Sequence, residues 1–173
     1  MKKTLLTIVA LTTLVATTQA AIIAHWGFDS FTGSPLPRSL APEDGLQTSA
    51  TLTVDPAGII AESHLASVTG TTLNGTAAFP GPSQAIEFQS MEGNQNGYTL
   101  HLSGVGRSDF FVTYAAKSTQ AGTTGNTWSW SLTGAAGSFT TVTTTGAIGL
   151  TYTTLTVDFS GVTALNGATD ISI

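Results

Sequence analysis

Bulky apolar residues alternate with small hydroxyl residues along most of the chain, which is the period-two pattern of half-buried β-strands. In the clearest run, Trp128, Trp130 and Leu132 alternate with Ser129 and Ser131, so the two sets are predicted to lie on opposite faces. Clusters of Gly, Pro, Asn and Ser separate the runs. Runs of this character span residues 22–28, 51–54, 66–71, 85–90, 98–103, 109–116, 127–133, 139–143, 153–159 and 168–173.

The run over residues 109–116 differs from the others because it carries large side chains on both faces. Phe110, Val112 and Tyr114 occupy one face, and Phe111 occupies the other, which predicts a central strand. No segment shows a convincing helical period, so helix content should be low. The sequence therefore predicts an all-β fold, a jelly-roll-like antiparallel β-sandwich.

The first 20 residues have the three parts of a secretory signal peptide. A positive start, Met1-Lys2-Lys3, precedes an uncharged apolar run over residues 4–16, and Thr18 and Ala20 provide small residues before the cleavage site. The alternative is a transmembrane anchor, but this run is shorter than the roughly 18 to 20 residues that cross a bilayer. We expect cleavage between Ala20 and Ala21, which leaves a mature protein that is secreted or held at the cell surface, outside the membrane.

The mature chain is expected to be one domain over residues 21–173, the size at which one hydrophobic core suffices. Its last run, residues 168–173, begins as a strand and stops at Ile173 without trailing polar residues. We therefore expect a domain that is incomplete at its C-terminus and lacks its last strand.

Composition narrows the classes of function. Only 9% of residues are charged, against roughly 25% in a typical soluble domain. The formal net charge of −5 becomes −7 once Lys2 and Lys3 leave with the signal peptide. Arg38, Arg107 and Lys117 are then too few cations for nucleic acid or an anionic membrane. The absence of cysteine excludes disulfides, thiolate metal sites and thiol nucleophiles.

From Tyr98 onward, the order of features resembles an extracellular domain of bacterial surface proteins that carry a PEP-CTERM sorting tail. The matching segments are Leu102-Ser103-Gly104, 109–114, 128–130, 139–142, 154–160 and 165–168. The resemblance implies a jelly-roll-like sandwich and surface export, with no assigned activity. In such proteins the final strand continues and a Pro-Glu-Pro motif, an apolar helix and a basic tail follow; none of these is present here, which agrees with an incomplete domain.

Trp128 and Trp130, with Tyr114, are the most suggestive candidates for a ligand site. Exposed aromatic rings can stack on sugars, which would make the protein a carbohydrate-binding module. Trp128 and Trp130 share a strand face with Leu132, and a sandwich strand with an apolar inner face shows the same pattern. We therefore favour core positions for these residues.

Acidic residues offer two further hypotheses. Glycoside hydrolysis needs two carboxylates held roughly 5 to 10 Å apart, and nothing in the sequence brings together any two of Glu62, Glu87 and Glu92. Calcium needs six to eight oxygen ligands. Asp29, Glu43 and Asp44 lie in or beside a Pro-rich loop without a calcium-binding motif. A structural calcium is the alternative, and we expect a solvated loop and no cofactor.

The histidines and serines show no catalytic pattern. His25, His64 and His101 are far apart in sequence, unlike the closely spaced pairs of catalytic zinc sites, and His25 and His101 are expected at the surface. No serine lies in a G-x-S-x-G context. We therefore expect no catalytic residues and no enzyme.

The leading hypothesis is a secreted, non-catalytic extracellular module with a structural, adhesive or surface-display role. Its partner would be an extracellular polysaccharide or the cell-surface matrix. The alternatives are a carbohydrate-binding module and, more weakly, a glycoside hydrolase or lyase.

Overall fold

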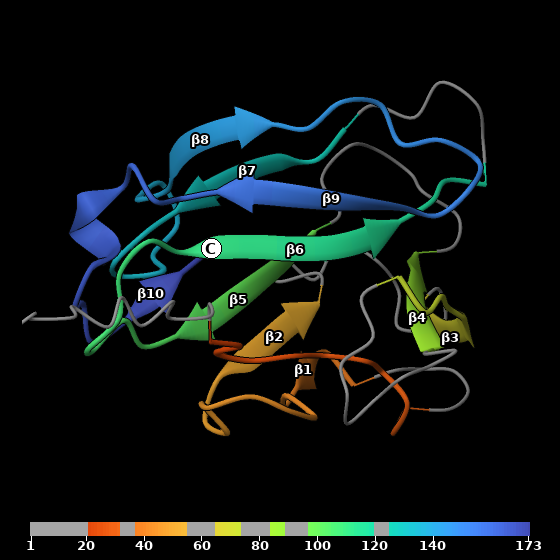
Figure 1. Ribbon diagram of the computed structural model, residues 1–173, viewed down its shortest axis with the longest axis horizontal. Helices are drawn as coiled ribbons and strands as arrows, with labels where there is room; N and C mark the ends of the chain where they lie inside the picture. The colour runs from red at the N-terminus through yellow and green to blue at the C-terminus, as the bar shows by residue number, and fades with distance from the viewer. Residues whose placement is uncertain (1–20, 32–36, 55–64, 74–83, 89–96, 120–124) are drawn as a thin grey trace, which may run out of the picture.

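The structure is a computed structural model that describes residues 21–31, 37–54, 65–73, 84–88, 97–119 and 125–173 (Figure 1). These residues form antiparallel strands joined by turns, so the predicted all-β fold is confirmed. The elements are β1 (Ser39–Leu40), β2 (Thr51–Val54), β3 (Leu65–Thr69), β4 (Gln84–Phe88), β5 (Tyr98–Leu102), β6 (Phe111–Ala116), β7 (Thr127–Trp130), β8 (Thr140–Thr144), β9 (Thr153–Asp158), the 3-10 helix η2 (Thr163–Leu165) and β10 (Ile171–Ser172). In the described part of the chain, no helix is both long and apolar enough to cross a bilayer.

The short strand β10 occupies the centre of the strand arrangement. A four-stranded sheet has the order β1-β2-β5-β10. On its other side, β10 reaches the end of β7 through a bridge between Ser172 and Ser131, whose N–H groups each donate to the other's carbonyl oxygen at 2.9 and 2.8 Å. β10 therefore connects the β1-β2-β5 strands to the β7–β8 ladder, and we call β5, β10 and β7 the seam.

The β6–β9 ladder packs across the seam. Figure 1 shows β6 and β9 side by side above β5, with β7 behind β9. Aromatic contacts connect these layers, because the Trp128 ring of β7 lies 5.2 Å from Tyr114 of β6 and 6.4 Å from Phe159, which follows β9. The core lies between the layers and consists of Leu40, Leu52, Val54, Leu100, Phe110, Trp128, Val157, Phe159, Leu165, Ile171 and Ile173. The jelly-roll-like sandwich is a finer arrangement and stays a prediction.

The β3–β4 ladder stands apart from these strands, to the right in Figure 1. Its five residue pairs run from Leu65 with Phe88 to Thr69 with Gln84. No other strand of the described residues pairs with it.

The predicted strand over residues 22–28 is wrong. His25 forms an isolated bridge with Asp44. Ile22 and Ile23 accept backbone hydrogen bonds from residues 46 and 47, but no strand ladder results. Phe28 has a φ of 62°, which turns the chain out of the extended conformation. Tertiary contacts rather than a strand ladder hold this segment.

Two further expectations are wrong, one about the position of β6 in its sheet and one about the faces of Ser131 and Leu132. In the described residues β6 pairs only with β9, and Phe111 is 55% exposed, so β6 is not a central strand. Ser131 is 2% exposed while Leu132 is 42% exposed, the reverse of the predicted faces. The cause is that regular pairing ends at Trp130, after a register shift that leaves Val142 of β8 without a partner on β7. Ser131 then turns inward to meet β10.

Candidate functional site

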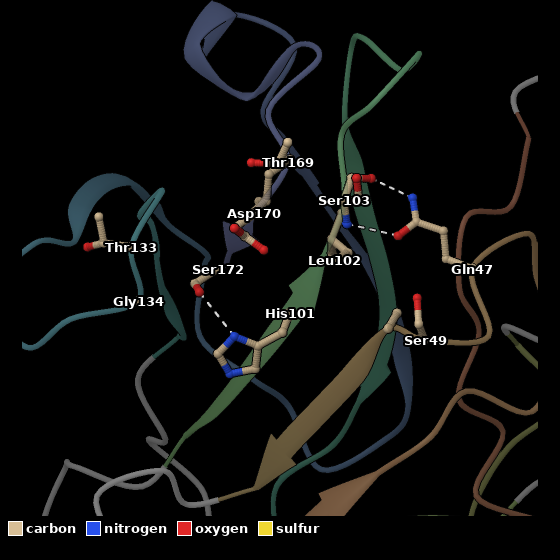
Figure 2. Close-up of a pocket in the computed structure, with 12 residues that line it drawn as sticks. Gln47, Ser49, His101, Leu102, Ser103, Thr133, Gly134, Thr169, Asp170 and Ser172 are labelled. Atoms are coloured by element: carbon tan, nitrogen blue, oxygen red, sulfur yellow. Dashed lines mark hydrogen bonds between the residues drawn. The ribbon is translucent and has the colours of Figure 1, made fainter.

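A polar hollow of about 420 Å³ lies on the seam, on the face turned away from the core. Figure 2 shows its walls, which come from the end of β5, the start of β10, the segment before β2 and the turn after β7. Its lining residues are Gln47, Ser49, Ala50, His101, Leu102, Ser103, Thr133, Gly134, Thr169, Asp170, Ile171 and Ser172. Eight of these twelve residues carry a side chain with a hydrogen-bonding group.

Strand alternation places these polar residues on one face. Thr51 is paired with His101, His101 with Ser172, and Ser172 with Ser131, so four polar residues form one row across four strands. Side chains of neighbouring positions along a strand point to opposite faces, which sends Ile171 into the core at 1% exposure. The same two-residue strand therefore fills the core with one face and lines the hollow with the other.

Hydrogen bonds fix two of the side chains that line the hollow. The Nδ1 atom of His101 lies 3.1 Å from the hydroxyl of Ser172. The amide of Gln47 binds the backbone of Ser103 at both ends: its oxygen accepts from the N–H at 2.8 Å, and its nitrogen donates to the carbonyl. The site is thus organised before any ligand enters.

Ser131 holds the turn that closes one side of the hollow. Its hydroxyl oxygen accepts hydrogen bonds from the N–H groups of Thr133 and Gly134, both at 3.0 Å, and lies 2.6 Å from the hydroxyl of Ser138. Gly134 has a φ of 64°, and a Cβ at this position would come within 2.9 Å of the Ser172 hydroxyl. Glycine is therefore required here both for backbone conformation and for space.

Three side chains that line the hollow keep their hydrogen-bonding capacity. The carboxylate of Asp170 and the hydroxyls of Thr169 and Ser49 make no hydrogen bond with another described residue. Asp170 directly precedes β10, two positions before Ser172, and lies above His101 in Figure 2. The hollow thus offers a carboxylate acceptor and free hydroxyl groups.

The His101–Ser172 contact has the distance expected between a base and a nucleophile. An acyl-transfer site also needs N–H donors aimed at the developing oxyanion. Three backbone donors around the hollow are engaged, because Thr133 and Gly134 donate to Ser131, and Ser103 donates to Gln47. The arrangement suits hydrogen bonding to a ligand better than nucleophilic chemistry.

The three aromatic residues singled out in the sequence occupy two different environments. Trp128 is 4% exposed, packs 5.5 Å from Tyr98, and donates from Nε1 to the Tyr114 hydroxyl at 3.3 Å. Asn126 donates to both tyrosine hydroxyls, at 3.4 Å to Tyr98 and 3.2 Å to Tyr114. Burial and the nearby Tyr114 raise the pKa of Tyr98. Trp128 and Tyr114 therefore share an internal network, and no face of the Trp128 ring is open to a sugar.

Trp130 is half-buried and lies at a second, shallower hollow. Thr140, Thr141 and Thr163 contribute hydroxyl groups around it, and Val142 and Val162 contribute apolar surface. Of the three aromatic candidates, Trp130 is the one that borders a surface hollow.

Glu43, His25 and Asp29 of the acidic and histidine candidates converge around Gly27, where an added Cβ would lie within 4 Å of all three side chains. Glu62, Glu92 and His64 lie outside the described residues, and Glu87 is on β4. No group of three or more His, Asp or Glu side chains suited to a metal ion occurs in the described ranges. His25 is half-buried beside Asp44, and His101, expected at the surface, is half-buried in the hollow.

Glu43 has a structural position. It accepts hydrogen bonds from the N–H of Gly27 at 3.0 Å and from the N–H and hydroxyl of Ser30 at 2.8 and 2.6 Å. Partial burial raises the pKa of Glu43, but the hydrogen bonds from Ser30, Asp29 and Gly27 outweigh burial and leave the pKa lowered. The ionised carboxylate therefore holds the segment over residues 27–30.

Comparisons with protein-family models, with curated proteins and with solved structures find no match for this chain. The resemblance to the PEP-CTERM group stays a prediction.

Sequence reasoning missed Asp170, Ser172, Gln47 and Ser49. The one available signal was the alternation of Asp170 and Ser172 with two isoleucines, which indicates a polar face on the last strand. The partner of that face depends on strand pairing, which the alternation leaves open.

Proposed function

We propose that this protein is an exported, non-catalytic extracellular module with an adhesive role in a structural or surface-display setting. The observation that carries the proposal is the organised polar hollow on the seam, where His101 and Gln47 are fixed while Asp170 stays free for a partner. The engaged N–H groups of Thr133 and Gly134 argue for binding rather than acyl transfer.

The sparsely charged outer surface supports the same function. Cross-strand hydroxyl pairs lie on the outer faces of two ladders, Thr113 with Thr156 at 3.1 Å and Thr127 with Thr144 at 3.1 Å. A surface of hydroxyl groups with few charges suits contact with an extracellular polysaccharide or the cell-surface matrix.

Export and surface location are part of the proposal and rest on the sequence of residues 1–20. The jelly-roll-like sandwich and the PEP-CTERM-like identity are proposed on the strand order and on the motifs from Leu102 to Ala168.

The test is to express the full chain in a secreting bacterial host and to determine the N-terminal sequence of the protein outside the cytoplasm. The proposal expects an extracytoplasmic protein that begins at Ala21. An uncleaved chain retained in the cytoplasm contradicts export. Turnover of ester or glycoside substrates that is lost in both S172A and H101A contradicts a non-catalytic role.

A second candidate function is sugar binding at Trp130, favoured by the half-buried indole ring beside three threonine hydroxyls. Both W128F and W130F retain Trp26, so the difference between them compares Trp130 with Trp128. Acrylamide quenching of fluorescence in W128F should exceed quenching in W130F, because Trp130 is half-buried beside a surface hollow and Trp128 is 4% exposed. Added saccharide should then reduce the quenching of W128F. Equal shielding of the two residues, or no response to saccharide, removes this candidate.

A further inference from the structure

We infer that the hollow on the seam binds a neutral, hydroxyl-rich ligand of the saccharide class, held through the carboxylate of Asp170. The inference rests on the proposed adhesive function and specifies its ligand and its site. The site is distinct from Trp130 and uses none of the aromatic residues that the sequence singled out.

The size and position of the hollow suit one or two sugar rings. Its volume of about 420 Å³ lies at the lower end of the range of roughly 300–1,000 Å³ found for small-molecule sites. It lies on the outer face of the sheet, and its floor is formed by the paired strands β5 and β10. A ligand can therefore reach it without opening the core.

The free polar groups match the chemistry of a vicinal diol. A carboxylate accepts two hydrogen bonds, one at each oxygen, and two neighbouring sugar hydroxyls can donate them. The hydroxyls of Thr169 and Ser49 both donate and accept, as sugar hydroxyls do. Charge-assisted hydrogen bonds such as those to Asp170 are roughly twice as strong as neutral ones. Asp170 is thus the expected anchor of the ligand.

The charge of the lining selects a neutral ligand. Asp170 is the one Asp, Glu, Lys or Arg residue among those lining the hollow, and the protein is acidic overall. An anionic ligand would meet this carboxylate without a compensating cation. A calcium ion needs six to eight oxygen ligands, whereas the hollow supplies a single carboxylate. A polyol satisfies both the carboxylate and the hydroxyl groups.

Organisation of the walls lowers the cost of binding. Gln47 and His101 are already held by Ser103 and Ser172, and the turn containing Gly134 is held by Ser131. Side chains that are ordered before binding lose less conformational entropy when a ligand arrives.

The experiment is an NMR titration of the ¹⁵N-labelled protein with methyl glycosides of glucose, galactose and mannose. Concentrations up to about 50 mM cover a weak site with a dissociation constant of roughly 1 mM. We expect at least one glycoside to shift the amide signals of His101, Asp170 and Ser172. In D170A the dissociation constant should rise at least about tenfold, since a charge-assisted pair of hydrogen bonds is lost.

The matched control is D158A, which removes an exposed carboxylate from the end of β9. D158A should bind as tightly as the unmodified protein. For D170A, an unchanged amide spectrum away from the hollow establishes that the variant is folded. The inference is overturned if no glycoside shifts these amides, if D170A binds as tightly as D158A, or if the shifts appear at Trp130 instead. Binding at the hollow by a protein that is not exported would support this inference and overturn the proposed function alone.

Discussion

The seam and the β3–β4 ladder are both built from short antiparallel strands, yet they are held in different ways. In the seam, β10 is paired on both sides: Ile173 exchanges two backbone hydrogen bonds with Leu100, at 2.8 and 3.0 Å, and Ser172 exchanges two with Ser131. The β3–β4 ladder is longer, but its strands pair only with each other in the described residues. A strand of two residues is therefore more firmly placed than a ladder of five residue pairs.

Side chains explain the difference. Ile171 and Ile173 of the seam are 1% and 5% exposed within the main core. The β3–β4 ladder makes less apolar contact, because Ile86 of β4 packs against the main core but is only partly buried. Polar contacts also hold it, including the Ser67 hydroxyl donating to Phe31 O at 2.9 Å and the Gln84 N–H donating to Asp29 at 3.1 Å. The net contribution of a hydrogen bond to the free energy of folding is smaller than that of a fully buried aliphatic side chain. The candidate site lies on the more firmly held region, as a preorganised site requires.

The largest expected effect comes from removing a buried side chain of the seam. I171A should lower the free energy of unfolding by about 2–5 kcal/mol, because it deletes buried methyl and methylene groups and leaves a cavity. The matched variant V68A, at a half-buried position of β3, should cost about 1 kcal/mol. Urea denaturation followed by tryptophan fluorescence measures both. Equal losses would remove the distinction between the two regions.

A smaller effect is expected at the turn that covers the seam. G134A and G137A both place alanine at a positive φ, 64° and 79°, which costs each about 1–2 kcal/mol. Only at Gly134 would the new Cβ also press on a neighbour, the Ser172 hydroxyl, whereas nothing lies within 4 Å at Gly137. Thermal unfolding should rank G134A as the less stable variant. The reverse order would mean that the turn does not pack on β10.

The smallest expected effect is a dependence of folding stability on pH, which arises at the segment that contacts the β3–β4 ladder. Glu43 fixes residues 27–30, and Asp29 of that segment binds Gln84. Because the folded pKa of Glu43 is lowered, its contribution to stability is present above its unfolded value of 4.5 and is lost as pH falls through the folded pKa.

The measurement is the denaturation midpoint between neutral and acidic pH, for the unmodified protein and for E43Q. The unmodified protein should lose more stability on acidification than E43Q does. Asp158, whose pKa is lowered by Ser160, contributes to both curves, so their difference isolates Glu43. Parallel curves would contradict the role of Glu43.

The strands were predictable where apolar and polar residues alternate and the apolar ones are the more buried. The run over residues 51–54 coincides with β2, whose burial alternates between half-buried and buried, and the run over 153–159 contains β9. The two-residue strand β1 was missed because it is too short to show a period. The run over residues 22–28 alternates equally well but is bent at Phe28, and a positive φ at phenylalanine leaves no mark in an apolar pattern.

The candidate site was beyond the reach of periodicity for a physical reason. Ser131, Ser172 and His101 meet because three strands far apart in sequence pair in one register, and each of the three residues alone reads as an ordinary polar position. The core position favoured for Trp128 agrees with its 4% exposure, since one strand face and its apolar neighbours sufficed for that inference.

The central claim is that β10 lies between β5 and β7 and joins them. Residue-specific hydrogen exchange of the backbone amides of Ser172 and Ile173 tests it most directly, because the first donates to Ser131 on one side and the second to Leu100 on the other. The account predicts that both amides exchange as slowly as the core amide of Leu100, through global unfolding. Rapid exchange of Ser172 and Ile173 beside a protected Leu100 would contradict it.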